Sequence, residues 1–203
     1  MQAPQDDTYY SIAGPAEGLY KEKGSKFLAF AYPVTSLDEI RERQEELRKQ
    51  YYDARHHCYA YILGKDGEQW RANDDGEPNH SAGDPILGQI RSQELSDVLI
   101  VVIRYFGGTK LGVSGLIHAY KTAAAEALDN AEREEKILST RCSFTFAYPD
   151  MNGVMKLVKD FDLTIIDQHF EMECRMTLEV RQGHAATVLS KLAEIESVQL
   201  EEE

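Results

Sequence analysis

The stretch from Val98 to Ala125 constrains the fold of this chain more than any other segment. It begins with six β-branched or large apolar residues, VLIVVI, which have the length and composition of a strand buried on both faces. A turn through Gly107 and Gly108 follows, and from Leu116 onward apolar residues recur at helical spacing. A strand, a glycine-rich turn and a helix in this order can point backbone N–H groups at an anion.

The same stretch contains no aspartate or glutamate. The chain has 35 acids among 203 residues, so a window of this length would hold about five. Basic side chains are present at three positions around the turn, and an acid-free basic segment in an acidic protein favours contact with something negative. We therefore expect a phosphate-binding or nucleic-acid-binding surface formed by Arg104, Gly107, Gly108, Lys110, Gly112 and Lys121.

Two alternative interpretations of this turn stay open. Gly107 and Gly112 have the spacing of a P-loop, but Val113 follows where that motif requires lysine. The glycines could therefore serve only to permit a tight turn and close packing of the helix on the strand. Arg104 comes directly after a buried strand, so it could instead anchor an acid of the loop Asp74–Glu77.

Charge and composition limit what the whole chain can do. A formal net charge of −13 argues against general, charge-driven adhesion to nucleic acid or anionic membranes, so contact with a polyanion must be local. The first residues lack the basic and apolar regions of a signal peptide, and no apolar run is long enough for a membrane span. Three widely separated cysteines, without a C-x-x-C pair, indicate reduced thiols and a cytoplasmic protein.

Before the central stretch, the sequence predicts strands and one long helix. Residues 8–34 read as two β-rich pieces joined by a polar connection around Gly18–Gly24. Ser36 and Glu39 form a capping-box pattern that begins a helix. Residues 53–64 read as a strand closed by a turn at 65–67.

The segment from residue 68 to residue 85 is polar, rich in glycine and proline, and without periodicity. It predicts a long loop, which inside a compact domain is often functional. A short helix is expected at Ile86–Leu95, with Pro85 near its first turn.

The last third of the chain predicts a second domain. Apolar periodicity stops in the charged segment Asp129–Lys136, and the elements that follow have the order β-α-β-β-α-β, the ferredoxin-like arrangement. We therefore expect an α+β protein with two domains, comprising residues 1–133 and residues 134–203.

Histidines and acids in the middle of the chain suggest a metal or hydrolase site. On a regular strand His56 and Cys58 share one face, whereas His57 points the other way, so one metal cannot take all three. We therefore predict no bound metal or cofactor. The competing interpretation is a metal-dependent or general-base hydrolase built from His56, His57, Asp74, Asp75 and Glu77.

Several motifs resemble those of a known family. RYFGGTKLG, preceded by GDPIL and LSDVLIVVI, resembles the signature of the YigZ/IMPACT family. ARHHCYAY and NDDGEP match two further blocks of that family in the same order, and the whole chain is similar to bacterial YigZ-type proteins. The resemblance implies a motif-lined cleft formed by Arg55, His56, His57, Asp74, Asp75, Gly76, Glu77, Pro78 and Tyr105.

The resemblance also implies a fold and a role. The first domain should share its β-α fold with a small-subunit ribosomal protein domain and with domain IV of the translocating elongation factor. The second should resemble that factor's domain V, and the family has been suspected of binding RNA or the ribosome. Its eukaryotic members regulate translation by restraining a kinase that responds to amino-acid starvation, through an extra N-terminal domain for which this chain has no room.

We therefore expect a non-catalytic, translation-associated regulator. Its partner would be RNA, the ribosome or a protein of the translation machinery, with no role at a membrane. No residue pattern supports the peptidase activity that has also been associated with the family.

Overall fold

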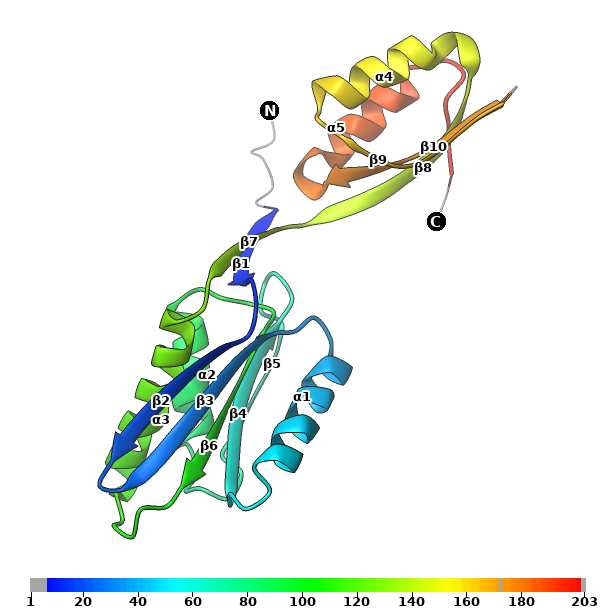
Figure 1. Cartoon of the computed structure of the whole chain (residues 1–203). Coiled ribbons are helices and arrows are strands. Elements are labelled where there is room, and N and C mark those ends of the chain that lie inside the picture. Colours follow the sequence, from blue (N-terminus) through cyan, green and yellow to red (C-terminus); the bar gives the residue numbers. More distant parts are fainter. Residues whose placement is uncertain (1–6, 172, 202–203) are drawn as a thin grey trace. The chain divides into compact units, whose positions relative to one another are not determined.

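The computed structural model describes residues 7–171 and 173–201, which form two compact units of mixed α and β structure (Figure 1). The N-terminal unit comprises Tyr9–Lys136. The C-terminal unit comprises the described residues from Ile137 onward together with Asp7 and Thr8. The expected boundary at residue 133 lies within strand β7 (Arg133–Ile137), which pairs with β1 (Thr8–Ile12) in a two-stranded sheet.

The N-terminal unit is built on a five-stranded antiparallel sheet with the order β2-β3-β6-β4-β5. Helix α1 covers one face of the sheet, whereas α2 and α3 cover the other (Figure 1). The elements are β2 (Ala16–Glu22), β3 (Ser25–Pro33), α1 (Leu37–Gln50), β4 (His56–Leu63), β5 (Gln69–Asn73), α2 (Gly83–Ser92), β6 (Val98–Tyr105) and α3 (Gly112–Asp129).

Strand β6 lies in the middle of the sheet and is buried on both faces, as the sequence predicted. Val98, Ile100 and Val102 pack in the core beneath α2 and α3, and the alternate residues pack in the core beneath α1. Both cores therefore depend on the same short strand. Because the side chains alternate, Arg104 falls on the same face as Val102, toward α3.

The start of α1 confirms the predicted capping pattern with one difference. The Ser36 side chain accepts a hydrogen bond from the Glu39 backbone N–H. The Glu39 carboxylate accepts a 2.7 Å hydrogen bond from the N–H of Thr35 and not from that of Ser36. The buried residues of the helix, Ile40 and Leu47, face the sheet.

The prediction of a polar connection around Gly18–Gly24 is wrong, because most of this segment forms strand β2. Gly18 misled the prediction, since glycine in a polar segment is typical of a loop. Here it permits close packing: a Cβ at Gly18 would come within 2.5 Å of the Ala127 nitrogen and within 2.8 Å of the Ala123 oxygen on α3. The glycine thus lets the helix backbone lie directly against the strand.

The long loop expected from residue 68 to residue 85 is also wrong in part. Its first third is the edge strand β5, which pairs with β4 in a register that sets Tyr61 opposite Arg71. Helix α2 begins at Gly83 and ends at Ser92, three residues earlier at each end than expected. Strand β5 lies at the edge of the sheet, and none of its side chains is fully buried. It therefore lacks the alternation of apolar and polar residues by which strands are found in a sequence.

The C-terminal unit confirms the ferredoxin-like prediction. Its antiparallel sheet has the order β11-β8-β10-β9, with α4 and α5 packed on the face that carries Phe144, Met176 and Leu178. The elements are β8 (Ser139–Ala147), a 3₁₀ turn η1 (Tyr148–Asp150), α4 (Met151–Asp160), β9 (Thr164–Phe170), β10 (Glu173–Arg181), α5 (Gln182–Ala193) and β11 (Gln199–Leu200).

Candidate functional site

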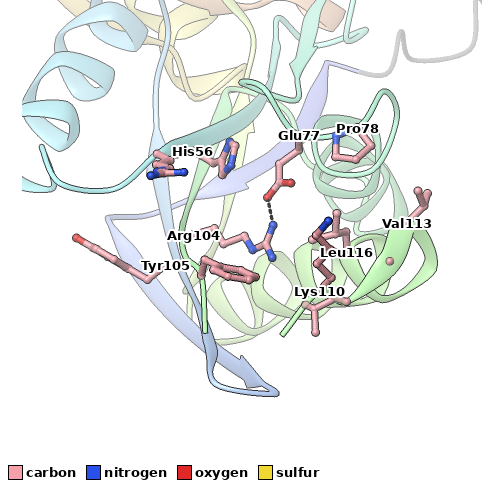
Figure 2. Close-up of a pocket in the computed structure, with 12 residues that line it drawn as sticks. His56, Glu77, Pro78, Arg104, Tyr105, Lys110, Val113 and Leu116 are labelled. Atoms are coloured by element: carbon pink, nitrogen blue, oxygen red, sulfur yellow. Dashed lines mark hydrogen bonds and ion pairs between the residues drawn. The ribbon is translucent and has the colours of Figure 1, made fainter. Parts of the chain in front are cut away.

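A pocket of about 660 Å³ lies in the N-terminal unit, where β6 ends and α3 begins (Figure 2). The strand delivers Arg104 and Tyr105, the turn delivers Phe106 and Lys110, and the loop after β5 contributes Glu77 and Pro78. Strand β4, which pairs His56 opposite Arg104, completes the polar side together with Arg55. The remaining wall is apolar and consists of Leu111, Val113 and Leu116 at the start of α3, beside Gly112.

The floor of the pocket is a buried ion pair. Arg104 Nη1 donates a 2.6 Å hydrogen bond to Glu77 Oε1, and both side chains are almost fully buried. The Tyr120 hydroxyl donates to the same oxygen at 2.8 Å, and the Cys58 thiol donates to the Tyr120 oxygen at 3.3 Å. The open alternative that Arg104 anchors an acid of the Asp74–Glu77 loop is thus confirmed, with Glu77 as that acid.

Burial keeps the two other members of this network neutral. Desolvation raises the pKa of the Cys58 thiol and raises the pKa of the Tyr120 hydroxyl far above their ordinary values. The nucleophilic form of cysteine is the thiolate, and Cys58 is fully buried, so it is a packing residue and a hydrogen-bond donor. The network therefore holds the loop of Glu77 against α3.

The two aspartates of the loop, Asp74 and Asp75, accept hydrogen bonds from backbone N–H groups. Asp74 Oδ1 accepts hydrogen bonds from the N–H groups of Ala82 and Gly83, at 2.9 and 2.8 Å, and so caps the start of α2. Asp75 Oδ2 accepts a 2.6 Å hydrogen bond from the His57 N–H, and Asp75 Oδ1 accepts from Arg48 at 3.2 Å. Neither aspartate lines the pocket.

The histidines lie on opposite faces of β4, as predicted. His56 lines the pocket, and its Nδ1 lies 2.9 Å from the Asp75 carbonyl oxygen, close to Gly76. His57 is buried on the side of α1, where desolvation lowers its pKa. The five residues of the hydrolase alternative therefore do not converge: of these, His56 and Glu77 line the pocket. Among the described residues, no group of three His, Cys, Asp or Glu side chains is placed to hold a metal.

The glycine turn is tightly constrained. Gly108 has a φ of +89°, which favours glycine, and this agrees with the structural role considered for the turn. Gly107 has no room for a side chain, because a Cβ there would lie 1.9 Å from the carbonyl carbon of Gly24. Its N–H donates to the Ser25 hydroxyl at 3.1 Å, which ties the turn to the β2–β3 hairpin.

The remaining predicted residues lie at the rim of the pocket, where Tyr105 and Lys110 stand, or outside the pocket. Tyr105 lines the edge and donates a 2.7 Å hydrogen bond to Asp53, which raises the Tyr105 pKa to about 12. Lys110 lines the pocket and is exposed, whereas Lys121 is exposed further along α3 and does not line it. Sequence reasoning assigned neither Phe106 nor the apolar wall to the site, although Phe106, Leu111 and Val113 were visible as apolar positions inside a basic stretch.

The fold and the pocket together define a two-unit α+β protein with a ligand-sized basic pocket beside its central strand. The Impact N-terminal domain matches residues 23–128, and the chain belongs to the IMPACT family.

Relatives of similar length extend the match to most of the chain. An IMPACT family member of Haemophilus influenzae is 31% identical over 180 residues, which cover 88% of this chain and 87% of the relative. The IMPACT family member YigZ of Escherichia coli is 29% identical over 184 residues, which cover 90% of each chain. A crystal structure described as that of a hypothetical protein has a TM-score of 0.71 and 29% identity, and covers 98% of this chain and all of its own.

Within the described ranges, no helix combines the length and the apolar character that crossing a bilayer requires.

Proposed function

We propose that this protein is a non-catalytic, translation-associated regulator that binds RNA or the ribosome through phosphate contacts at the basic pocket. The observation that carries the proposal is the fold of the acid-free stretch. It brings Arg104, Lys110 and the start of α3 to one pocket in a protein whose net charge is −13. The family resemblance, which implies translation regulation in eukaryotic members, supports the biological setting and a cytoplasmic location.

The phosphate-binding surface extends from the pocket along α3. Residues Val113, Ile117 and Lys121 are four apart, so they follow one stripe of the helix, and all three are exposed. From Gly112 to Lys121 the helix rises by about 14 Å, at 1.5 Å per residue. No acid occurs on α3 before Glu126. A strand of RNA seated at the pocket can therefore follow the helix without meeting a carboxylate of α3 over this length.

Two features match this surface to phosphate. Backbone N–H groups at a helix start bind anions, and the first turn of α3 carries no acid. Lysine and arginine form strong, charge-assisted hydrogen bonds with phosphate oxygens. Because the whole protein repels polyanions, affinity must come from these few contacts. Binding should weaken as salt is added, with the shallow slope that a few phosphate contacts give.

Co-sedimentation with ribosomes tests the proposal. We expect the parent chain to sediment with ribosomes at low salt, and Lys110→Glu/Lys121→Glu to remain in the supernatant. The matched control is Lys156→Glu/Lys159→Glu, which reverses two exposed lysines of α4 and changes the net charge equally, from −13 to −17. Nuclease treatment before sedimentation shows whether RNA carries the contact. Absence of parent binding at low salt, or equal loss in both double variants, contradicts the proposal.

A further inference from the structure

The pocket floor holds a buried cationic group that is incompletely satisfied. Arg104 is 8% exposed and lines the pocket, with Nη1 bound to Glu77. Its Nε is buried and makes no hydrogen bond with any described residue. A buried donor without a partner destabilises the fold, so native proteins rarely keep one without a functional reason. The Nε and Nη2 groups form the edge of a guanidinium that binds an oxyanion in bidentate fashion.

The start of α3 adds a second source of positive potential to the same pocket. The helix has 18 residues, and its N-cap position, Leu111, provides no side-chain hydrogen bond. Its first turn contains no acid, and Gly112 and Val113 line the pocket. The uncapped N–H groups and the helix dipole therefore favour an anion at the place where Arg104 also favours one.

The charges of the lining residues leave a surplus for a ligand. Among the described lining residues there are three cations, Arg55, Arg104 and Lys110, and one acid, Glu77. With histidine counted as neutral, these lining residues carry a net charge of +2, and the acid is already paired with Arg104. Figure 2 shows Glu77, Arg104 and Lys110 around the same hollow. A dianion would balance this surplus.

The rest of the pocket is suited to an organic body and not to a bare ion. The apolar wall consists of Leu111, Val113 and Leu116, and Pro78 adds to the apolar lining. The volume of about 660 Å³ is in the range of small-molecule sites. Phe106 is 59% exposed, and its ring centroid lies 5.7 Å from the Arg104 guanidinium carbon. An exposed aromatic ring beside a cation is a surface on which a nucleobase can stack.

We infer that the pocket binds one nucleotide through a terminal, dianionic phosphate. The phosphate lies on the free edge of Arg104, at the start of α3 and near Lys110, and the nucleoside lies against Phe106 and the apolar wall. The inference deepens the proposed function and rests on the same phosphate chemistry. It adds that the pocket selects a phosphate end, either of a free mononucleotide or of an RNA chain, over a phosphate inside the chain.

Calorimetric titration of the full chain with adenosine 5′-monophosphate tests the inference. We expect one equivalent to bind, and adenosine and inorganic phosphate each to bind at least tenfold more weakly. Lys110→Glu should weaken the affinity at least tenfold, whereas Lys156→Glu, which makes the same change of charge at an exposed position of α4, should leave it unchanged.

A second pair of variants tests the pocket itself without changing charge. Val113→Trp should fill the pocket and abolish binding, whereas Ile166→Trp, at an exposed isoleucine of β9, should bind normally. Melting temperatures of all four variants check that they fold. Equal binding by the two tryptophan variants overturns the inference. Benzoate, an aromatic anion without phosphate, is the comparison ligand, and tighter binding of benzoate than of the nucleotide also overturns it.

Two oligoribonucleotides of one sequence, with a 5′-phosphate or a 5′-hydroxyl, separate the sources of the phosphate. Tighter binding of the phosphorylated chain assigns the pocket to an RNA end. Binding of the mononucleotide without any RNA or ribosome binding supports the pocket inference and overturns the proposed function. Equal RNA binding by both oligonucleotides, without competition from the mononucleotide, overturns the inference and leaves the proposed function standing.

Discussion

The floor and the rim of the pocket use charge in opposite ways. On the floor, Arg104 and Glu77 are buried and paired, and Tyr120 donates to the same carboxylate oxygen. On the rim and along α3, Lys110 and Lys121 are exposed and form no ion pair with a described residue. The basic residues Arg104, Lys110 and Lys121 all come from one acid-free stretch, whereas Glu77 comes from the loop after β5. The difference teaches that a basic residue next to a buried strand is held by the fold and offers a ligand only the edge that its partner leaves free, whereas one on the helix surface offers its whole charged group.

The largest expected loss of stability follows from removing one partner of the Arg104–Glu77 ion pair. Glu77→Ala leaves Arg104 buried without its partner, and losing one member of a buried pair typically costs about 3–5 kcal/mol. We expect the free energy of unfolding in urea to fall by that order. Glu77→Leu/Arg104→Met removes both charges and should cost less than the single change. A double variant less stable than Glu77→Ala would show that the pair is not what the floor depends on.

The glycine turn connects Arg104 on the floor with Lys110 on the rim. A substitution in this turn should cause the second-largest loss of stability. Gly107→Ala would place a Cβ 1.9 Å from the Gly24 backbone, so we expect a loss of about 1–3 kcal/mol, the usual range for overpacking. Gly14→Ala is the control, because nothing lies within 4 Å of a Cβ there. Thermal melting compares the two variants. Equal melting temperatures for both would mean that the turn tolerates displacement.

A smaller effect concerns pH and the opposite face of β4. Burial lowers the pKa of His57 in the folded state, so the unfolded state binds its proton first as pH falls. Stability should therefore decrease as pH drops below the unfolded pKa of about 6.5. Unfolding curves at several pH values should show a weaker decrease for His57→Gln than for the parent. The control is His118→Gln, at an exposed side chain of α3 that forms no ion pair with a described residue, and it should retain the parent's slope.

The smallest expected effect on stability belongs to the rim. Lys110→Glu/Lys121→Glu changes exposed side chains, so the free energy of unfolding should change by less than about 0.5 kcal/mol. Chemical denaturation checks this directly. A loss as large as that of Gly107→Ala would show that the rim lysines support the fold and would remove the distinction between rim and floor.

Much of this architecture could be predicted from the sequence, where the pattern of apolar residues reports burial. Strand β6 and helix α3 were found because their apolar residues recur with the period of a buried strand and of a helix. Strands β2 and β5 were missed because they lie at the edges of the sheet. There, one glycine needed for helix packing and a row of exposed polar residues imitate a loop.

The sequence could predict many of the residues that belong to the site, but not which of them contact each other. The sequence grouped Asp74, Asp75 and Glu77 as one acidic cluster, yet two of them satisfy backbone N–H groups and the third pairs with Arg104. Which acid meets Arg104 depends on the path of the loop after β5, and nothing in the spacing specifies that path. The apolar wall was not assigned to the site for a similar reason, because only the path of the turn places Leu111 and Val113 beside Arg104.

The dependence of RNA affinity on salt tests the central claim most directly. Fluorescence anisotropy with a single-stranded RNA should give a log K that falls against log salt with a slope near −2, because about three phosphate contacts release roughly 0.7 counterions each. Lys110→Glu/Lys121→Glu should abolish this binding, and Lys156→Glu/Lys159→Glu should retain it with the same slope. Parent protein that does not bind at low salt, or a rim double reversal that binds as well as the parent, would contradict the account.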